Sequence, residues 1–126
     1  PRMKIRIVVK ALKEDMTPEF AEKSQGFAKG FAASVRKNIK AAKTLDPKSR
    51  WGWCTVRLSA IVEVGGIALR GDDYLGGCSY TSELDFVRNS GYFNDMVKKV
   101  ISSAVESFNT EMAKEQGRFL QKLAGG

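Results

Sequence analysis

The sequence has no histidine, only two cysteines and no long hydrophobic run. Without histidine, Ser-His-Asp and Cys-His catalytic sites and His-ligated zinc sites are excluded. Cys54 and Cys78 are too few for a disulfide framework and lack Cys-x-x-Cys spacing, so we expect reduced thiols and no metal or other cofactor. The apolar runs fall far short of the roughly 20 residues that span a bilayer, so no membrane partner is expected. The first residues show no signal-peptide pattern, which predicts a cytoplasmic location.

Positive charge is concentrated in the first part of the chain. The 126 residues, enough for a single domain, carry a net charge of +7. Residues 1–50 hold 13 basic and 5 acidic groups, whereas residues 51–126 hold 8 basic and 9 acidic groups. This asymmetry favours an anionic partner such as nucleic acid, an acidic protein or a lipid surface, although a need for solubility explains it equally well.

Residues 3–10 alternate between apolar and basic side chains, which predicts a half-buried strand. Met3, Ile5, Ile7 and Val9 share the apolar face. The opposite face presents three cations: Lys4, Arg6 and Lys10.

A helix is predicted from about residue 18 to residue 43. Thr17 is placed as its N-cap and Pro18 as its first residue. Four cations share a face away from the apolar one: Lys29, Arg36, Lys40 and Lys43. Such a stripe is able to contact phosphates, but it is also typical of a solvated helix face. Gly26 and Gly30 lie inside this helix, where they indicate either the close approach of another chain or simple tolerance.

Residues 46–50 predict a turn, and Lys48 and Arg50 extend the basic stripe into it. From Trp51 to Val64 the pattern has period two, and Gly65-Gly66 predicts a tight hairpin. Closing the hairpin there pairs Val64 with Ile67, Val62 with Leu69 and Val56 with Leu75. This register would turn Asp73 and a glycine of each segment toward the core at residues 70–73 and at Gly76-Gly77. We therefore expect a bulge or a broken strand there.

Two helical segments are predicted to end the chain. Ser82 and Asp85 have the spacing of a helix cap, and Gly91 is expected to interrupt the helix. A long amphipathic helix from about 92 to 123 should then exceed the diameter of the domain at roughly 45–50 Å. Its last turns therefore need a partner or fray, and a homodimer would bury Met112, Phe119 and Leu120.

The order strand, helix, hairpin, helix predicts an α+β fold with a three-stranded, mainly antiparallel sheet and two helices on one face. If the first helix is a right-handed crossover, the first and second strands are parallel and the third lies between them. This order resembles a ferredoxin-like or RNA-recognition fold without its fourth strand, but it lacks the aromatic-rich recognition pattern.

The other sheet face is predicted to be open and to bind an anion. Aromatic rings supply stacking surfaces for bases, while Lys and Arg neutralise phosphates. We expect this face to carry Trp53, Arg57, Ile61, Arg70, Tyr74 and Tyr80, besides the three cations of the first strand.

The leading hypothesis is therefore a small, basic, non-enzymatic protein that binds DNA or RNA through this face and the first helix. Its rival is a protein-interaction module, for example a phage- or plasmid-type accessory or inhibitor protein that docks on an acidic partner. A magnesium-dependent nuclease built on Glu63, Asp72 and Asp73 is a distant third, because a hairpin tip and a turn routinely carry such acids.

Overall fold

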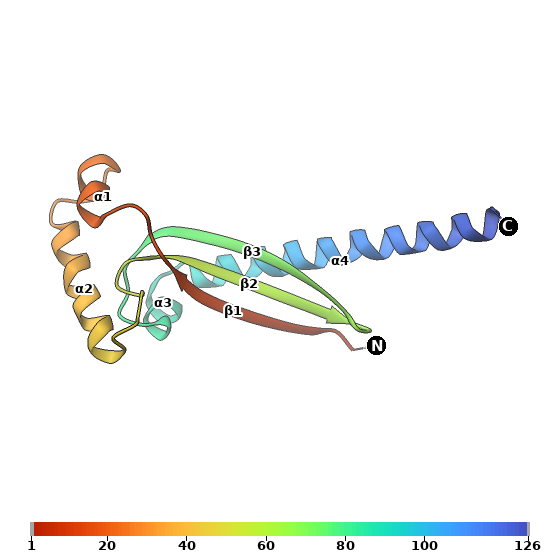
Figure 1. The fold of residues 1–126 in the computed structure, drawn as a ribbon, viewed down its shortest axis with the longest axis horizontal. Helices are drawn as coiled ribbons and strands as arrows, with labels where there is room; N and C mark the ends of the chain where they lie inside the picture. The colour runs from red at the N-terminus through yellow and green to blue at the C-terminus, as the bar shows by residue number, and fades with distance from the viewer. Residues whose placement is uncertain (1, 126) are drawn as a thin grey trace.

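A three-stranded antiparallel sheet forms the centre of the molecule, with helices against one face and at one end (Figure 1). The computed structural model describes residues 2–125. The elements in chain order are β1 (Lys4–Leu12), α1 (Pro18–Ser24), α2 (Phe31–Leu45), β2 (Cys54–Val64), β3 (Ile67–Cys78), α3 (Glu83–Asn89) and α4 (Phe93–Ala124). The mixed α+β class predicted from the sequence is confirmed.

The β2–β3 hairpin has the register that its apolar alternation predicted. Val64 pairs with Ile67 and Val62 with Leu69, and the two turn glycines have φ values of 58° and 81°. Both glycines are thus in the left-handed region that a two-residue turn requires. The strands stay paired through residues 70–73, so the expected irregularity there is absent.

The irregularity lies instead at the far end of the hairpin, beside Gly76 and Gly77. The register shifts between the Val56–Leu75 pair and the Cys54–Cys78 pair, and Gly77 has a φ of 65°. This shift restores the pairing of two buried residues, Cys54 and Cys78, after the two glycines. The bulge predicted at this position is confirmed.

The predicted strand order is wrong. β2 is the central strand, and β1 pairs with it antiparallel rather than parallel, from Lys4 opposite Glu63 to Leu12 opposite Thr55. A crossover helix would have to run back along β2, whose 11 residues span about 36 Å. α2, with 15 residues, is only about 22 Å long. The chain therefore turns around at one end of the sheet and returns antiparallel.

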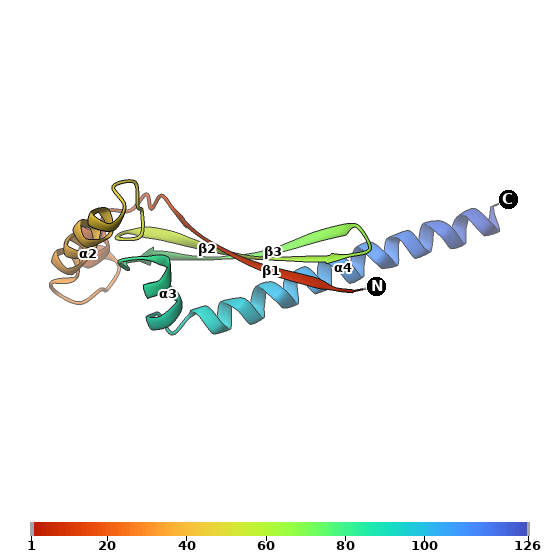
Figure 2. The same cartoon turned by 90° about the horizontal axis from the view of Figure 1, so that it is seen from below.

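The single helix predicted over residues 18–43 is also wrong, because it is two helices. Gly26 and Gly30 have φ values of 75° and 88°, which a helix interior does not allow, and the chain folds back between them. α1 and α2 consequently pack on each other at the end of the sheet instead of covering its face (Figures 1 and 2). Thr17 caps α1 as predicted, since its side chain accepts the N–H of Phe20.

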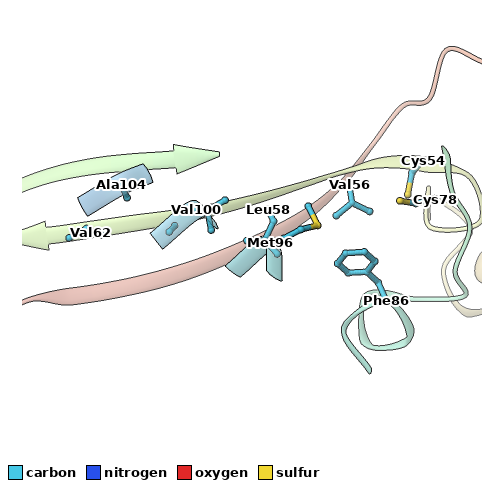
Figure 3. Packing of buried hydrophobic residues seen from close by; sticks show 10 residues of the cluster. Cys54, Val56, Leu58, Val62, Cys78, Phe86, Met96, Val100 and Ala104 are labelled. Carbon is cyan, nitrogen blue, oxygen red and sulfur yellow. The ribbon is translucent and has the colours of Figure 1, made fainter. Parts of the chain in front are cut away.

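α3 and α4 cover one face of the sheet and enclose the core with it (Figures 2 and 3). The core contains inward-facing residues of β2, namely Cys54, Val56, Leu58, Ala60 and Val62, under Phe86 of α3 and Met96, Val100 and Ala104 of α4. Ser82 caps α3 through the N–H of Asp85, and Gly91 separates the two helices, both as predicted.

The second half of α4 extends beyond the hairpin tip (Figure 1). Phe108 is its last buried residue, and Met112, Phe119, Leu120 and Leu123 are exposed. Among residues 2–125, no helix is both long enough and apolar enough to cross a membrane.

Candidate nucleic-acid interface

The sheet face opposite α3 and α4 carries five cations, and we call it the basic face. The pairing of the strands aligns them on one side of the sheet: Lys4, Arg6, Lys10, Arg57 and Arg70. Among residues 2–125, two carboxylates share this face, Glu63 and Asp72, so its net charge is +3. Within the described part of the chain, no helix lies over the middle of this face (Figure 2).

Arg70 is held in place by a small polar network at the centre of the basic face. Its Nε donates to Asp72 Oδ1 at 2.7 Å and its Nη2 to Ser59 Oγ at 3.1 Å. The Ser59 hydroxyl also donates to Asp72, and Ser59 is only 2% exposed. The Ser59 hydrogen bond, followed by that of Arg70, lowers the pKa of Asp72. Asp72 therefore offsets the charge of Arg70, and the other four cations supply the positive field.

Tyr74 supplies the one exposed aromatic ring of the basic face in the described residues. It pairs with Arg57, which pairs in turn with Lys10, so a ring and two cations form one row across the strands. Tyr74 is 56% exposed, and adjacent strands lie about 4.8 Å apart. A base stacked on Tyr74 would thus have its phosphates within reach of Arg57 and Lys10.

Trp53 and Tyr80 do not lie on the open face, contrary to the prediction. Trp53 precedes β2, donates its Nε1–H to the carbonyl oxygen of Met16 at 2.6 Å, and meets Phe31 of α2 edge-on at 5.7 Å. Tyr80 packs against Phe86 of α3 at 5.3 Å. Both rings hold helices against the sheet, because the chain leaves the strand pattern at these two positions.

Two hollows beside the basic face share Ser49 and Arg50, and we call the segment 49–50 the Arg50 wall. One hollow, of about 340 Å³, is lined by the cations Lys13, Arg36, Lys43 and Arg50, with Trp53 at its side. The other, of about 450 Å³, is lined by the cations Lys10, Lys48 and Arg50 and by one acid, Asp46. Lys10 belongs to both the second hollow and the basic face, so positive charge continues from the sheet to α2.

Glu14 is the one carboxylate that the described part of the chain places in the smaller hollow, and it already accepts three hydrogen bonds. Its Oε1 accepts the N–H of Gly77 at 2.7 Å and the hydroxyl of Thr55 at 3.2 Å, and its Oε2 accepts the N–H of Met16 at 3.3 Å. These bonds fasten the loop after β1 to the bulge of the hairpin. The hollow keeps a positive balance because four cations surround this single acid.

The predicted helical stripe is only partly preserved. Arg36 and Lys43 line the smaller hollow, but Lys29 lies in the turn between the helices and Lys40 lines neither hollow. Arg36 makes a 2.9 Å ion pair with Glu19, which raises the pKa of Arg36 and lowers that of Glu19. Both side chains are well exposed, so solvent screens the pair and it contributes little to stability.

Sequence reasoning missed Lys13, Glu14 and the Ser59–Asp72 bond. Lys13 and Glu14 follow β1 without any period or motif. Ser59 has the outward parity of a strand residue, and only the pairing with Asp72 reveals its role. The sequence offered one signal for this bond: in the predicted hairpin, Ser59 faces outward and is paired with an acid, Asp72, near Arg70.

A further hollow, of about 600 Å³, lies elsewhere, between β3 and α4. It is lined by two acids, two lysines and two tyrosines, including Asp73, Asp95, Tyr74 and Tyr92. Its charges balance, so it does not favour an anion. Among residues 2–125, no group of three or more potential ligands is arranged to hold a metal ion.

Comparisons with protein-family models, with curated proteins and with solved structures found no match to this chain. Its function is therefore inferred from its own residues and their geometry.

Proposed function

We propose that this protein binds single-stranded nucleic acid, DNA or RNA, along the basic face and the Arg50 wall. The observation that carries the proposal is the row of Lys10, Arg57 and Tyr74, which joins an exposed ring to a continuous line of cations. Proteins that bind single strands combine these two features, a positive track for the phosphates and rings on which bases stack.

The dimensions of the basic face suit a short single strand. From Lys4 to Lys10 the face runs about 20 Å, and three strands make it about 10 Å wide. It is a sheet surface and presents neither a protruding helix nor a ribbon that would enter the major groove of a duplex. The ligand therefore lies flat on the strands, with bases accessible for stacking.

The strength and salt dependence of binding follow from the available cations. Five of them have no acidic partner within 4.0 Å in the described chain: Lys4, Arg6, Lys10, Arg50 and Arg57. Each phosphate neutralised on a single strand contributes a slope of about −0.7 to the dependence of log K on log salt. Five contacts thus predict a slope of about −3.5, or a loss of affinity of roughly 100-fold from 50 to 200 mM salt.

Fluorescence anisotropy with labelled 10-nucleotide DNA and RNA tests the proposal across a salt series. The variant Arg57→Glu should bind at least about tenfold more weakly and reduce the salt slope by about 1 or more. Tyr74→Ala should lose about 1–3 kcal/mol of binding with little change in slope, since stacking does not depend on counterions.

Arg88→Glu is the matched control, because Arg88 is an exposed arginine of α3, which lies on the other side of the sheet. It makes the same change in net charge and should leave affinity nearly unchanged. Equal loss in Arg57→Glu and Arg88→Glu would show that only net charge matters. If neither oligonucleotide binds at low salt, the proposal is rejected and an acidic protein is favoured as the partner.

A second candidate function, self-association, rests on the projecting half of α4. Met112, Phe119 and Leu123 are exposed and lie within about 40° of one another at 100° per residue. Met112 follows Phe108, the last buried residue of the same helix, by one turn. An isolated helix of about 16 residues is marginal in water, so a covered stripe is the more stable state.

The charges of this segment favour a second copy of the chain that runs antiparallel. With Met112 opposite Leu123 of a second copy, Lys122 of that copy is only two residues, about 3 Å, from the position opposite Glu115, and the two-fold axis makes this contact twice. Glu115 also forms an ion pair with Arg118 in its own helix. Lys122 of the second copy would be a second cation beside the same carboxylate. A parallel arrangement would bring Glu115 near Leu120 and gain no such contact.

Sedimentation equilibrium of charge-swapped variants tests this arrangement. Glu115→Lys and Lys122→Glu should each weaken the dimer by about tenfold, since each places two like-charge contacts in it. The double variant restores opposite charges and should recover most of the affinity. A monomer at all concentrations, or single variants that dimerise like the parent, would refute the antiparallel dimer.

A further inference from the structure

The two cysteines of the chain are paired directly across the β2–β3 hairpin. Cys54 and Cys78 are opposite each other in the register, immediately after the bulge at Gly76 and Gly77. Figure 3 shows their side chains meeting at one end of the core cluster. Both are free thiols here, 0% and 4% exposed. Their spacing in the sequence showed no motif, so only the register reveals the pair.

We propose that Cys54 and Cys78 form a cross-strand disulfide when the chain folds in the presence of a disulfide oxidant. Directly paired residues of antiparallel strands have Cα atoms about 4.5–5.5 Å apart. A disulfide accepts Cα separations of about 4.4–6.8 Å. The register therefore brings the two cysteines within the range that a disulfide accepts, and the bond needs no residue from outside the hairpin.

The chemistry is thiol–disulfide exchange with a small disulfide such as oxidised glutathione. One cysteine thiolate attacks a glutathione sulfur, which forms a mixed disulfide and releases the first glutathione thiolate. The second cysteine thiolate then attacks the protein sulfur of that mixed disulfide and releases the second glutathione thiolate. The two protons lost by the cysteines end on the two glutathiones, so two protein thiols are oxidised and one glutathione disulfide is reduced.

Burial sets when this reaction takes place. Removal from water is the largest cause that raises the pKa of Cys54, to about 12, and that of Cys78, to about 11. The folded, reduced protein thus holds almost no thiolate and excludes the oxidant sterically. Oxidation belongs to folding, before α3 covers the pair, and once formed the bond is shielded from reductants. The disulfide acts as a permanent staple and not as a reversible switch.

The staple closes the end of the hairpin that supports the loop after β1. Gly77, next to Cys78, donates its N–H to Glu14, and Tyr80 donates its N–H to the carbonyl oxygen of Trp51 at 2.9 Å. The cross-link would keep these two attachments in place in the folded protein. In the unfolded chain it would close the loop from residue 54 to residue 78 and so lower the conformational entropy of that state. This inference does not depend on the proposed binding of nucleic acid.

Refolding of the reduced, denatured full chain in a buffer of reduced and oxidised glutathione tests the proposal. The refolded monomer should weigh about 2 Da less than the reduced chain, and iodoacetamide should modify neither cysteine after denaturation. Proteolysis should yield one cross-linked peptide that contains Cys54 and Cys78. The oxidised chain should also unfold at a higher urea concentration than the reduced chain.

The single variant Cys54→Ala is the control, because its remaining thiol has no partner within the chain. It should refold without the loss of 2 Da and carry either a free thiol or one glutathione, as expected for an incomplete exchange. In the parent chain, two alkylatable thiols, glutathione adducts on folded protein, or disulfide-linked dimers would each overturn the proposal. If the parent fails to refold, the same glutathione buffer is added to the reduced protein at a urea concentration that partly unfolds it and exposes the pair, and the same mass measurement decides between the outcomes.

Discussion

Replacing Gly71 with alanine tests how closely α4 packs on the sheet. Gly71 lies on the covered face of β3, opposite Ala60, and is buried. A Cβ built on it would stand 2.8 Å from the backbone nitrogen of Ala104 and still closer to the carbonyl oxygen of Val100. Both atoms belong to the backbone of α4, so no side chain can turn aside to make room.

The magnitude follows from the shift that the helix must make. Ordinary contact requires roughly another 1 Å between Gly71 and α4, which would loosen the packing of Val100 and Ala104 on β2. Overpacking of this kind destabilises by about 1–3 kcal/mol, and a rigid helix backbone places Gly71→Ala at about 2–3 kcal/mol. With an unfolding entropy of about 2.1 cal/mol/K per residue, the melting temperature should fall by roughly 8–11 °C.

Urea and thermal unfolding followed by circular dichroism measure this effect. Gly117→Ala is the matched control, since Gly117 lies in the projecting half of α4 and a Cβ there would meet no atom within 4 Å. Alanine favours a helix over glycine by about 1 kcal/mol, so this variant should be neutral or slightly stabilised. If Gly71→Ala stays within about 0.5 kcal/mol of the parent, the direct contact between α4 and β3 is refuted.

Two further predictions concern the helices at the ends of the sheet. The pKa of Asp85 is lowered, first by the N–H of Thr81 and then by the amide of Asn89, so its stabilisation is present above the unfolded pKa near 4 and is lost as pH falls through the folded value. Asp85→Asn should therefore show a smaller drop in the urea midpoint between about pH 4.5 and pH 2 than the parent, and an equal drop would exclude this role. Trp53→Phe removes the hydrogen bond to Met16 and should destabilise the fold by about 1 kcal/mol in urea unfolding, while oligonucleotide affinity stays unchanged. Loss of affinity in a fully folded Trp53→Phe protein would instead place Trp53 in the interface.

Local patterns in the sequence determined most of the individual elements. Two glycines with positive φ defined the β2–β3 turn, and the alternation of Val and Leu residues defined its register, because a slip by one residue would expose the whole apolar face. Thr17 and Ser82 marked helix starts through their side-chain oxygens. These signals act between residues close in sequence, so no knowledge of the tertiary structure is needed to read them.

The arrangement of these elements was decided only by the tertiary structure. Whether β1 runs parallel or antiparallel to β2 depends on where the intervening chain packs, and Gly52 leaves room for it to pack at the sheet end. A Cβ on Gly52 would collide with the backbone of Ile39 in α2, so the glycine lets α2 approach the start of β2 directly. Trp53 packs against α2 at this end of the sheet and is therefore not on the open face. Arg57 and Tyr74 lie on the open face because they belong to regularly paired parts of β2 and β3. Cys54 and Cys78 became neighbours through a one-residue bulge, and contacts of that kind between distant residues leave no period in the sequence.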